Sequence, residues 1–165
     1  PMAAAGMDPV GIAGVDGFLE TELVDPARLG RVGRVAGGDA EELRTLMRAG
    51  KTPVLAPISL APDGGLVNVN ADEAASAVAR ALGARELLFV SDVPGVLRDG
   101  RRIGRIAPSE IDGLILAGVV TEGMVAKLLA AQAAEVGAIR IGDLEMLGSP
   151  TAGTSIALGA RRSAA

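Results

Sequence analysis

Residues 66–90 have the sequence LVNVNADEAASAVARALGARELLFV, and the order of apolar and polar residues in it indicates the class of fold. Alternating apolar and polar residues over 66–70 predict a strand, and the apolar side of residues 72–82 predicts an amphipathic helix. Gly83 is expected to end this helix, and the apolar run at 86–90 predicts a second, buried strand. A strand, a helix and a strand in this order are typical of a βαβ unit in an α/β protein.

The same alternation of strands and helices extends outward from this stretch. Residues 19–38, with Pro26 and several glycines, are expected to form loops or hairpin strands. Further strands are predicted over residues 10–14, 53–58, 138–141 and 154–158, and further helices over 39–49, 108–117 and 121–136. We therefore predict one α/β domain over residues 1–165, a three-layer αβα sandwich with a mostly parallel sheet.

The composition excludes several kinds of chemistry. The 165 residues are 49% hydrophobic, which predicts a folded core, but they include no Cys, His, Trp or Tyr and only two Phe. Nucleophile systems built on His or Cys, disulfides and structural zinc are therefore excluded. Chemistry is left to carboxylates, Lys and Arg, hydroxyls, amides, backbone N–H groups and a hard metal such as Mg²⁺.

Charge and hydropathy also limit the partners. A net charge of -4 and the scarcity of aromatic residues argue against a nucleic-acid partner. No apolar run approaches the roughly 18–20 residues of a membrane-spanning helix. We expect a cytoplasmic protein that binds neither nucleic acid nor membrane.

Three polar segments follow predicted strands, where ligands bind in open α/β sheets. In the first, Asn68 and Asn70 alternate on a strand, and Asp72 opens the next helix. The two amides can bind a carboxylate or amide ligand, while Asp72 can hold a cation or orient a lysine. The alternative is structural, with Asp72 as a helix-terminal acid and the asparagines bonded to loop backbone.

The second segment comes after the strand predicted at 86–90. Its small hydroxyl, its acid and its backbone amides suit the ribose or the base edge of a nucleotide, although an ordinary turn with a capping acid remains the alternative. We assign to nucleotide binding Ser91, Asp92, Val93, Pro94, Gly95, Val96 and Leu97.

The third segment begins the helix predicted at 121–136. A helix N-terminus attracts anions, and Lys127 on its second turn can reach the same phosphate. The alternative is that Thr121 only caps the helix and Lys127 is a solvated side chain. We add to the predicted nucleotide site Val119, Val120, Thr121, Gly123 and Met124.

Together these segments resemble the amino acid kinase family, over residues 10–158. The similar runs are residues 50–58, 68–72 with Ala74 and Ala75, 88–97, 118–127 and 153–156. The resemblance implies ATP-dependent phosphorylation of the side-chain carboxylate of N-acetyl-L-glutamate, which gives an acyl phosphate for arginine biosynthesis. It implies ATP and Mg²⁺ as cofactors and a homo-oligomer, a dimer or a hexamer.

The resemblance also implies roles for individual residues. The residue matching Lys127 stabilises charge on the transferring phosphoryl group, and the one matching Asp72 organises the catalytic lysines. Asn68 matches a ligand of the α-carboxylate end of the substrate. Residues 1–60 correspond to the remainder of a substrate lobe with its connection, and residues 61–165 to a nucleotide-binding lobe.

One part of the family pattern is not matched. Members open with a strand that carries a Lys and a Gly-Gly turn, followed by a second Gly-rich loop, and this sequence begins with PMAAAG. We therefore expect a chain that is incomplete at its N-terminus and inactive alone. Two alternatives remain, a kinase for another N-blocked amino-diacid of the aminoadipate type and a nucleotide-binding module without catalysis.

Overall fold

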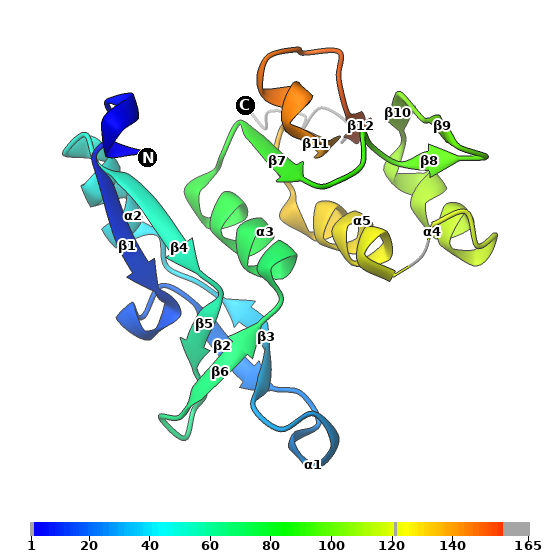
Figure 1. Cartoon of the computed structure of the whole chain (residues 1–165). Coiled ribbons are helices and arrows are strands. Elements are labelled where there is room, and N and C mark those ends of the chain that lie inside the picture. Colours follow the sequence, from blue (N-terminus) through cyan, green and yellow to red (C-terminus); the bar gives the residue numbers. More distant parts are fainter. Residues whose placement is uncertain (1, 121, 157–165) are drawn as a thin grey trace, which may run out of the picture. The chain divides into compact units, whose positions relative to one another are not determined.

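The structure is a computed structural model that describes residues 2–120 and 122–156 (Figure 1). The chain divides into two compact units, Pro1–Leu82 and Gly83–Ala165. The sequence predicted a lobe boundary near residue 60, whereas these units divide 22 residues later, at the end of a helix. The assignment of the lobes to substrate and nucleotide stays a prediction.

The first unit contains two sheets and the helices that accompany them (Figure 1). Its strands are β1 (Pro9–Ala13), β2 (Glu20–Leu23), β3 (Val32–Gly37), β4 (Thr52–Ala56), β5 (Ile58–Leu60) and β6 (Leu66–Val69). Its α-helices are α1 (Pro26–Leu29), α2 (Glu41–Arg48) and α3 (Ala71–Leu82), with 3₁₀ turns at Ala3–Ala5 and Gly14–Asp16. β1 pairs with β4 in parallel, and the other sheet has the order β2-β3-β6-β5.

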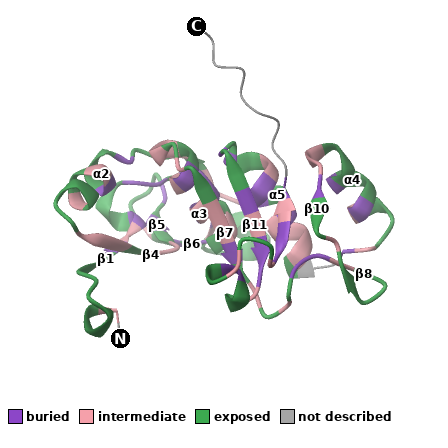
Figure 2. Cartoon of the chain, turned by 90° about the horizontal axis from the view of Figure 1, so that it is seen from above, coloured by how far each residue is buried: buried purple, intermediate pink, exposed green. Residues whose placement is uncertain are grey.

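The larger sheet of this unit buries one face and exposes the other (Figure 2). Val67 and Val69 of β6 are 1% and 2% exposed, and they belong to one hydrophobic cluster with Leu43 of α2 and Ala77 of α3. The intervening residues of β6 are exposed, because successive side chains of a strand point to opposite faces. The exposed face therefore carries Asn68, beside the half-exposed Ile58 with which it pairs.

The second unit is built around a four-stranded sheet of order β10-β12-β11-β7. Its strands are β7 (Glu86–Val90), β8 (Leu97–Arg98), β9 (Arg101–Arg102), β10 (Arg105–Ile106), β11 (Ala138–Gly142) and β12 (Thr154–Ile156). Its helices are α4 (Pro108–Leu116) and α5 (Glu122–Ala134), with a 3₁₀ turn at Leu144–Leu147. Ile139, Ile141 and Leu128 are fully buried and form part of its core.

The α/β class is confirmed, and the pairing of its strands is mixed. Among the described strands, four pairs are parallel and four are antiparallel. The antiparallel pairs include β5–β6 and β8–β9, whose connections are tight turns that cannot join parallel strands. β6 already has β3 and β5 on its two edges, so β7 lies in another sheet and α3 connects two sheets rather than two neighbouring strands.

Most of the predicted helices and strands agree with the structure, but the single strand predicted over residues 53–58 is divided at Pro57 into β4 and β5, which belong to different sheets. α3 begins one residue before the predicted helix, and α2 is shorter than predicted because Ala40 is its N-cap residue. Residues 19–38 do form hairpin strands, since β2 and β3 pair antiparallel. The start of the helix predicted at residue 121 and the end of the strand predicted at 154–158 lie outside the described residues.

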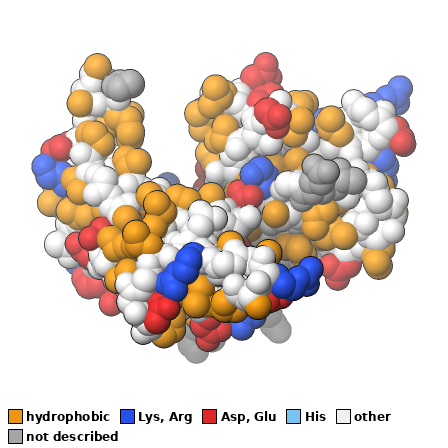
Figure 3. Space-filling model, turned by 60° about the horizontal axis from the view of Figure 1, so that its bottom comes forward, with side chains coloured by type: hydrophobic (Ala, Val, Ile, Leu, Met, Phe, Trp, Pro, Cys, Tyr) orange, Lys and Arg blue, Asp and Glu red, His pale blue; other side chains and the backbone are white. Residues whose placement is uncertain are grey.

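Apolar side chains also reach the surface. Figure 3 shows hydrophobic side chains lying between positive and negative ones on the face in view. The most exposed large ones are Leu116 and Leu144, at 88% and 69%. Isolated exposed leucines are normal in globular proteins and carry no functional argument.

Candidate functional site

Asn70 lies at the junction between β6 and α3 and caps the helix. Its side-chain Oδ1 accepts hydrogen bonds from the backbone N–H groups of Asp72, at 2.9 Å, and Glu73, at 3.2 Å. These are two of the N–H groups that a helix start leaves without a helical partner. The amide oxygen of Asn70 is therefore committed to the helix, and a bond from Asn70 to a ligand has to come from its amide nitrogen.

Asn68 lies in β6, two residues before this cap. Its side chain is exposed on the face opposite the buried Val67 and Val69. Its backbone N–H donates to the carbonyl oxygen of Arg31 at 3.0 Å, which continues the parallel pairing of β6 with β3. The side chain of Asn68 therefore stands on the open face of the sheet, close to the carboxyl end of its strand.

Asp72 is the second residue of α3 and is half-buried. A carboxylate in the first turn is favourable beside the positive end of the helix dipole. Its backbone carbonyl accepts a hydrogen bond from the Ser76 hydroxyl at 2.9 Å, within the helix. This position agrees with both predicted roles of Asp72, the helix-terminal acid and the orienting carboxylate, so its catalytic role stays a prediction.

In the second unit, the predicted nucleotide segment begins where β7 ends. β7 and β11 are parallel, so their carboxyl ends lie at the same edge, and the Ser91 N–H donates to the carbonyl of Gly142 at 2.7 Å. The Ser91 hydroxyl donates to Oδ1 of Asp92 at 3.2 Å. A hydroxyl and an exposed carboxylate thus stand together after the strand, as a ligand at a sheet edge requires.

The next part of this segment is held against β12 by Thr154. The Thr154 hydroxyl accepts from the N–H of Val96 at 2.8 Å and donates to the carbonyl of Ile103 at 2.6 Å. Gly95 has φ +145°, and a Cβ there would lie 2.6 Å from the same hydroxyl oxygen. Only glycine fits this close approach. Residues 95 and 96 are consequently buried and fixed in place.

The third predicted segment lies between α4 and α5 and in the first turns of α5. Val120 is buried, Val119 and Met124 are half-buried and Gly123 is exposed, while Thr121 lies outside the described residues. Lys127 follows on the second turn of α5 and is half-buried, next to the fully buried Leu128. The lysine thus belongs to the edge of a packed helix face.

The predicted site residues are divided between the two units. One group, in the first unit, holds Asn68, Asn70 and Asp72 within the β6–α3 junction. The other, in the second unit, holds the segment after β7 and the start of α5. The predicted catalytic residues belong to different units, Asp72 to the first and Lys127 to the second.

Sequence reasoning missed the side chains that hold these segments. Thr154 was included only in the predicted strand over 154–158 and the similar run 153–156, and Asp63 was given no role. The contacts that give them their importance join residues 58 and 32 positions apart, respectively. Local periodicity carries no signal at such separations.

The described residues contain neither a cluster of metal ligands nor a membrane-spanning helix. No three His, Cys, Asp or Glu side chains in residues 2–120 and 122–156 form a group that could hold a metal ion. Within the same ranges, no helix has both the length and the apolar character needed to cross a membrane.

Polar groups at the ends of strands lie where α/β proteins bind ligands, and the fold of this chain belongs to that class. A family comparison is more specific, because the model of the amino acid kinase family matches residues 1–141. The chain belongs to the amino acid kinase family. The match includes every predicted site residue in both units.

Among curated proteins, the chain is similar to several acetylglutamate kinases. It is 48% identical to that of Geobacillus stearothermophilus over 130 residues, which are 78% of this chain and 50% of the relative. It is 49% identical to that of Roseiflexus over 152 residues, which are 88% of this chain and 58% of the relative. The chain thus spans about half the length of the curated relatives it matches.

Solved structures support the same fold. The smu.665 protein of Streptococcus mutans superposes with a TM-score of 0.86 at 29% identity, over 94% of this chain and 63% of that one. The carbamate kinase of Giardia lamblia bound to AMP-PNP superposes with a TM-score of 0.62 at 22% identity, over 76% of this chain and 46% of that one. The second likeness concerns the fold alone.

Proposed function

We propose that this chain is part of an enzyme that phosphorylates the side-chain carboxylate of N-acetyl-L-glutamate with ATP. The observation that carries the proposal is the 48% identity to an acetylglutamate kinase over 130 residues, a range that includes most of both units. The product is N-acetyl-L-glutamyl 5-phosphate, and the reaction belongs to arginine biosynthesis. The two relatives named above are acetylglutamate kinases, which favours this substrate over a different N-blocked amino-diacid.

The reaction needs few reactive groups from the protein. A carboxylate oxygen of the substrate attacks the γ-phosphorus of ATP, the bond to the β-phosphate oxygen breaks, and ADP leaves. Because the carboxylate is already ionised, no general base is needed, which agrees with a sequence that contains no His and no Cys. Phosphoryl transfer depends mainly on positioning and on positive charge at the phosphates.

We assign the substrate to the β6–α3 junction. Asn68, exposed on the open face of its sheet, donates its amide N–H to the α-carboxylate end of the substrate. Asn70 keeps its oxygen on the helix cap and donates from its nitrogen. Asp72 supplies the carboxylate that orients lysine side chains during transfer.

We assign the nucleotide to the second unit. Ser91 and Asp92 lie at the sheet edge and bind the ribose, while the fixed backbone at Gly95 and Val96 forms the wall beside the base. Lys127 supplies positive charge to the transferring phosphoryl group. The remaining predicted contacts are Val93, Pro94, Leu97, Val119, Val120, Thr121, Gly123 and Met124.

Mg²⁺ fits this donor set as an ion that arrives with the nucleotide. Magnesium in kinases keeps several waters and needs only one or two carboxylates besides the phosphates. The described residues contain no three-ligand acidic group, and such a mode of binding does not need one. The ion would neutralise charge on the β- and γ-phosphate oxygens, and Asp92 is an exposed carboxylate within the predicted nucleotide segment that could take part.

We further propose a cytoplasmic enzyme that acts as a homo-oligomer, a dimer or a hexamer, with no nucleic acid or membrane partner. The supporting observations are the net charge of -4 and the membership of a family of kinases for small molecules.

The proposal is tested by a coupled assay of ADP release with the full-length protein as it is encoded. ADP release that requires both ATP and N-acetyl-L-glutamate is the expected result. L-Glutamate and N-acetyl-2-aminoadipate serve as matched substrates, the first without the acetyl group and the second longer by one methylene. Equal or faster turnover of either one would contradict the proposed substrate, and nucleotide binding without any turnover would indicate a binding module.

A further inference from the structure

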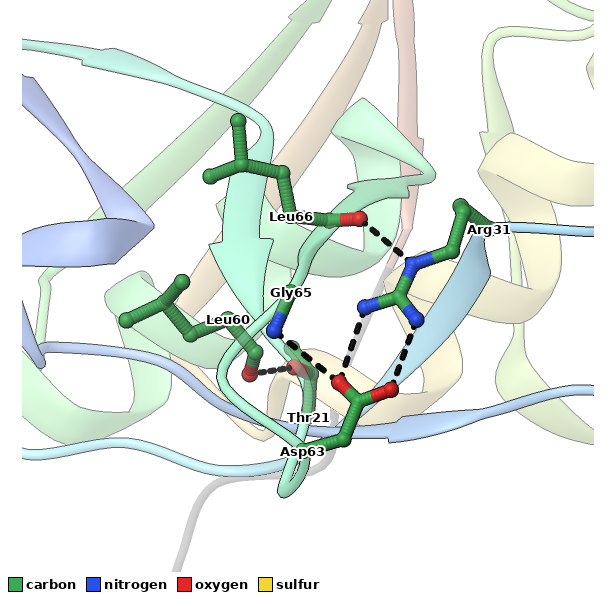
Figure 4. A network of polar contacts seen from close by, with 6 residues as sticks. All are labelled: Thr21, Arg31, Leu60, Asp63, Gly65 and Leu66. Carbon is green, nitrogen blue, oxygen red and sulfur yellow. Dashed lines mark hydrogen bonds and ion pairs between the residues drawn. The ribbon is translucent and has the colours of Figure 1, made fainter.

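Arg31 lies between α1 and β3, and its side chain contacts the turn that joins β5 to β6 (Figure 4). Its Nη1 and Nη2 donate to the two carboxylate oxygens of Asp63, at 2.7 and 2.9 Å. Its Nε donates to the carbonyl oxygen of Leu66, the first residue of β6, at 3.0 Å. One guanidinium therefore binds both the turn and the strand that leaves it. We call this set of contacts the Arg31–Asp63 clamp.

The carboxylate of the clamp is held from its other side as well. Oδ1 of Asp63 also accepts a hydrogen bond from the N–H of Gly65 at 2.9 Å. The hydrogen bonds from Arg31, followed by the one from Gly65, hold the pKa of the Asp63 carboxyl well below its usual range. The guanidinium lies so close to Gly65 that a Cβ there would collide with its Nη2. The turn thus contains both the carboxylate of Asp63, which binds the guanidinium, and Gly65, which leaves space for that guanidinium.

The backbone of Arg31 contacts the same strand. Its carbonyl oxygen accepts the N–H of Asn68 at 3.0 Å, so Arg31 binds β6 at both residues 66 and 68. The ladder between β3 and β6 is short and consists of two residue pairs, Val32 with Asn68 and Gly33 with Val69. The clamp therefore supplies a large part of the contacts that set the register of β6 against β3.

The register of β6 decides where Asn68 points. Because side chains alternate along a strand, a slip by one residue would turn Asn68 toward the core and expose Val67 or Val69. On the other strand of the hairpin, the Thr21 hydroxyl donates to the carbonyl of Leu60 at 2.6 Å (Figure 4). The hairpin is thus held from β2 on one side and from Arg31 on the other.

The clamp is better suited to positioning than to stability. The Arg31 and Asp63 side chains are 46% and 56% exposed, and ion pairs at such sites add little to the free energy of unfolding. A bidentate pair nevertheless fixes the direction of both groups, which a single contact does not. The cost of losing the clamp should therefore be seen mainly in the geometry of β6.

We propose that Arg31 is a positioning residue of the N-acetylglutamate site, which acts by clamping the β5–β6 turn so that Asn68 faces the substrate. This inference rests on the proposed function. It concerns a residue 37 positions before Asn68, in a loop that the predicted site does not include.

Two variants open the clamp in independent ways. Arg31→Met removes all three side-chain bonds and keeps the apolar stem. Gly65→Ala keeps both charged groups, but its methyl group displaces the guanidinium, which is the flexible end of a long side chain. Each is expected to raise the KM for N-acetyl-L-glutamate about tenfold, because small displacements of positioning groups have effects of that order or larger. The KM for ATP should change less than about twofold, since the nucleotide is assigned to the other unit.

Three controls make the measurement specific. Lys51→Met breaks the ion pair with Asp8, which has a length of 2.6 Å and side-chain exposures of 39% and 62%. This similar pair lies just before β1 and β4, which form the other sheet of the unit. It should leave both KM values unchanged. Arg31→Lys keeps one donor for Asp63 and should recover only part of the affinity. The double variant R31M/G65A should be no worse than R31M, because both changes remove one interaction.

Hydrogen exchange of the backbone provides a readout that does not depend on activity. Peptides covering residues 58–70 should exchange faster in R31M and G65A than in K51M. Unchanged exchange, or an unchanged KM for N-acetyl-L-glutamate in an active R31M protein, would overturn the clamp alone. Failure of the unaltered protein to phosphorylate N-acetyl-L-glutamate would overturn the proposed function, and this inference with it.

Discussion

The buried hydroxyl of Thr154 in β12 accepts a hydrogen bond from the backbone N–H of Val96 at 2.8 Å, across 58 residues of sequence. The same hydroxyl donates to the carbonyl of Ile103 at 2.6 Å, so one side chain satisfies a donor and an acceptor of the β8–β9 hairpin. Both Thr154 and Val96 are fully buried. At Val96, the segment assigned to the nucleotide is therefore bonded to β12 through this hydroxyl group.

Thr154→Val should destabilise the second unit by about 1–3 kcal/mol, because a methyl group of similar size leaves the buried N–H of Val96 and the partly buried C=O of Ile103 without this hydroxyl. It should also weaken ATP binding, since the backbone at residues 95 and 96 loses its anchor. Urea denaturation and calorimetric titration with ATP measure the two effects. Thr154→Ser keeps the hydroxyl and should retain nucleotide binding. A loss of ATP binding in Thr154→Ser but not in Thr154→Val would show that the methyl group of Thr154 matters rather than its hydroxyl.

Asn70→Ala should lower the free energy of unfolding by about 1 kcal/mol, because two N–H groups at the start of α3 lose their acceptor. Asn70→Ser keeps an oxygen at this position and should retain most of the stability. The two variants separate the cap from the proposed contact with substrate. If the amide nitrogen of Asn70 binds substrate, N70S should raise the KM for N-acetyl-L-glutamate while its thermal midpoint stays close to that of the unaltered protein. Full activity of N70S would assign Asn70 to the cap alone.

Lys127→Ala should reduce kcat by about a hundredfold to a thousandfold, the usual effect of removing one group that stabilises charge in the transition state. Initial rates of ADP release at saturating substrates measure this. The sequence contains one other lysine, Lys51, whose replacement by Ala removes the same charge and provides the matched control. A Lys127→Ala protein with normal kcat and a lowered thermal midpoint would instead indicate a structural residue of α5.

The stability contributed by Asp63 should depend on pH. Hydrogen bonds from Arg31 lower the pKa of Asp63 in the folded protein, so the carboxylate stabilises the fold at pH values above its unfolded pKa of about 3.9. This contribution is lost as the pH falls through that value toward the lower pKa of the folded state. The difference in thermal midpoint between the unaltered protein and D63N should therefore be constant from pH 7 to about pH 5 and shrink below about pH 4.

The cause of this pH dependence can be checked in an R31M background. There the hydrogen bonds from Arg31 are absent and only the one from the Gly65 N–H still lowers the pKa of Asp63, so the effect of D63N on the midpoint should change less with pH than in the unaltered protein. A difference that persists undiminished at low pH in the unaltered protein would argue against a charged pair. The effect should be small, because both side chains are about half exposed.

Much of the secondary structure and part of the site could be predicted from local patterns. The alternation of Val67, Asn68 and Val69 predicted a strand with one buried face, and the structure has that strand and that face. The short strands β8, β9 and β10 were not predicted, because two-residue strands rich in arginine have no apolar period to reveal them. Helix α1 is a single turn and was missed for a similar reason.

The α/β class, the exclusion of His and Cys chemistry and the positions of the polar segments that follow the strands could all be predicted from the sequence alone. These properties depend on composition and on periods of two to four residues, which any stretch of chain displays locally. Membership of the amino acid kinase family also lies in the sequence, and it was first indicated by the runs at residues 68–72, 88–97 and 118–127.

Tertiary structure decided which strands are neighbours and which side chains hold the site. β6 pairs with β3 and β5 rather than with β7, Asn70 caps α3, and Thr154 and Arg31 anchor segments that are distant in sequence. The physical reason is that a hydrogen bond depends on where two groups lie in space, within about 3 Å of each other. No local pattern contains that information, because it arises only when the sheets have formed and the chain has returned to the same place.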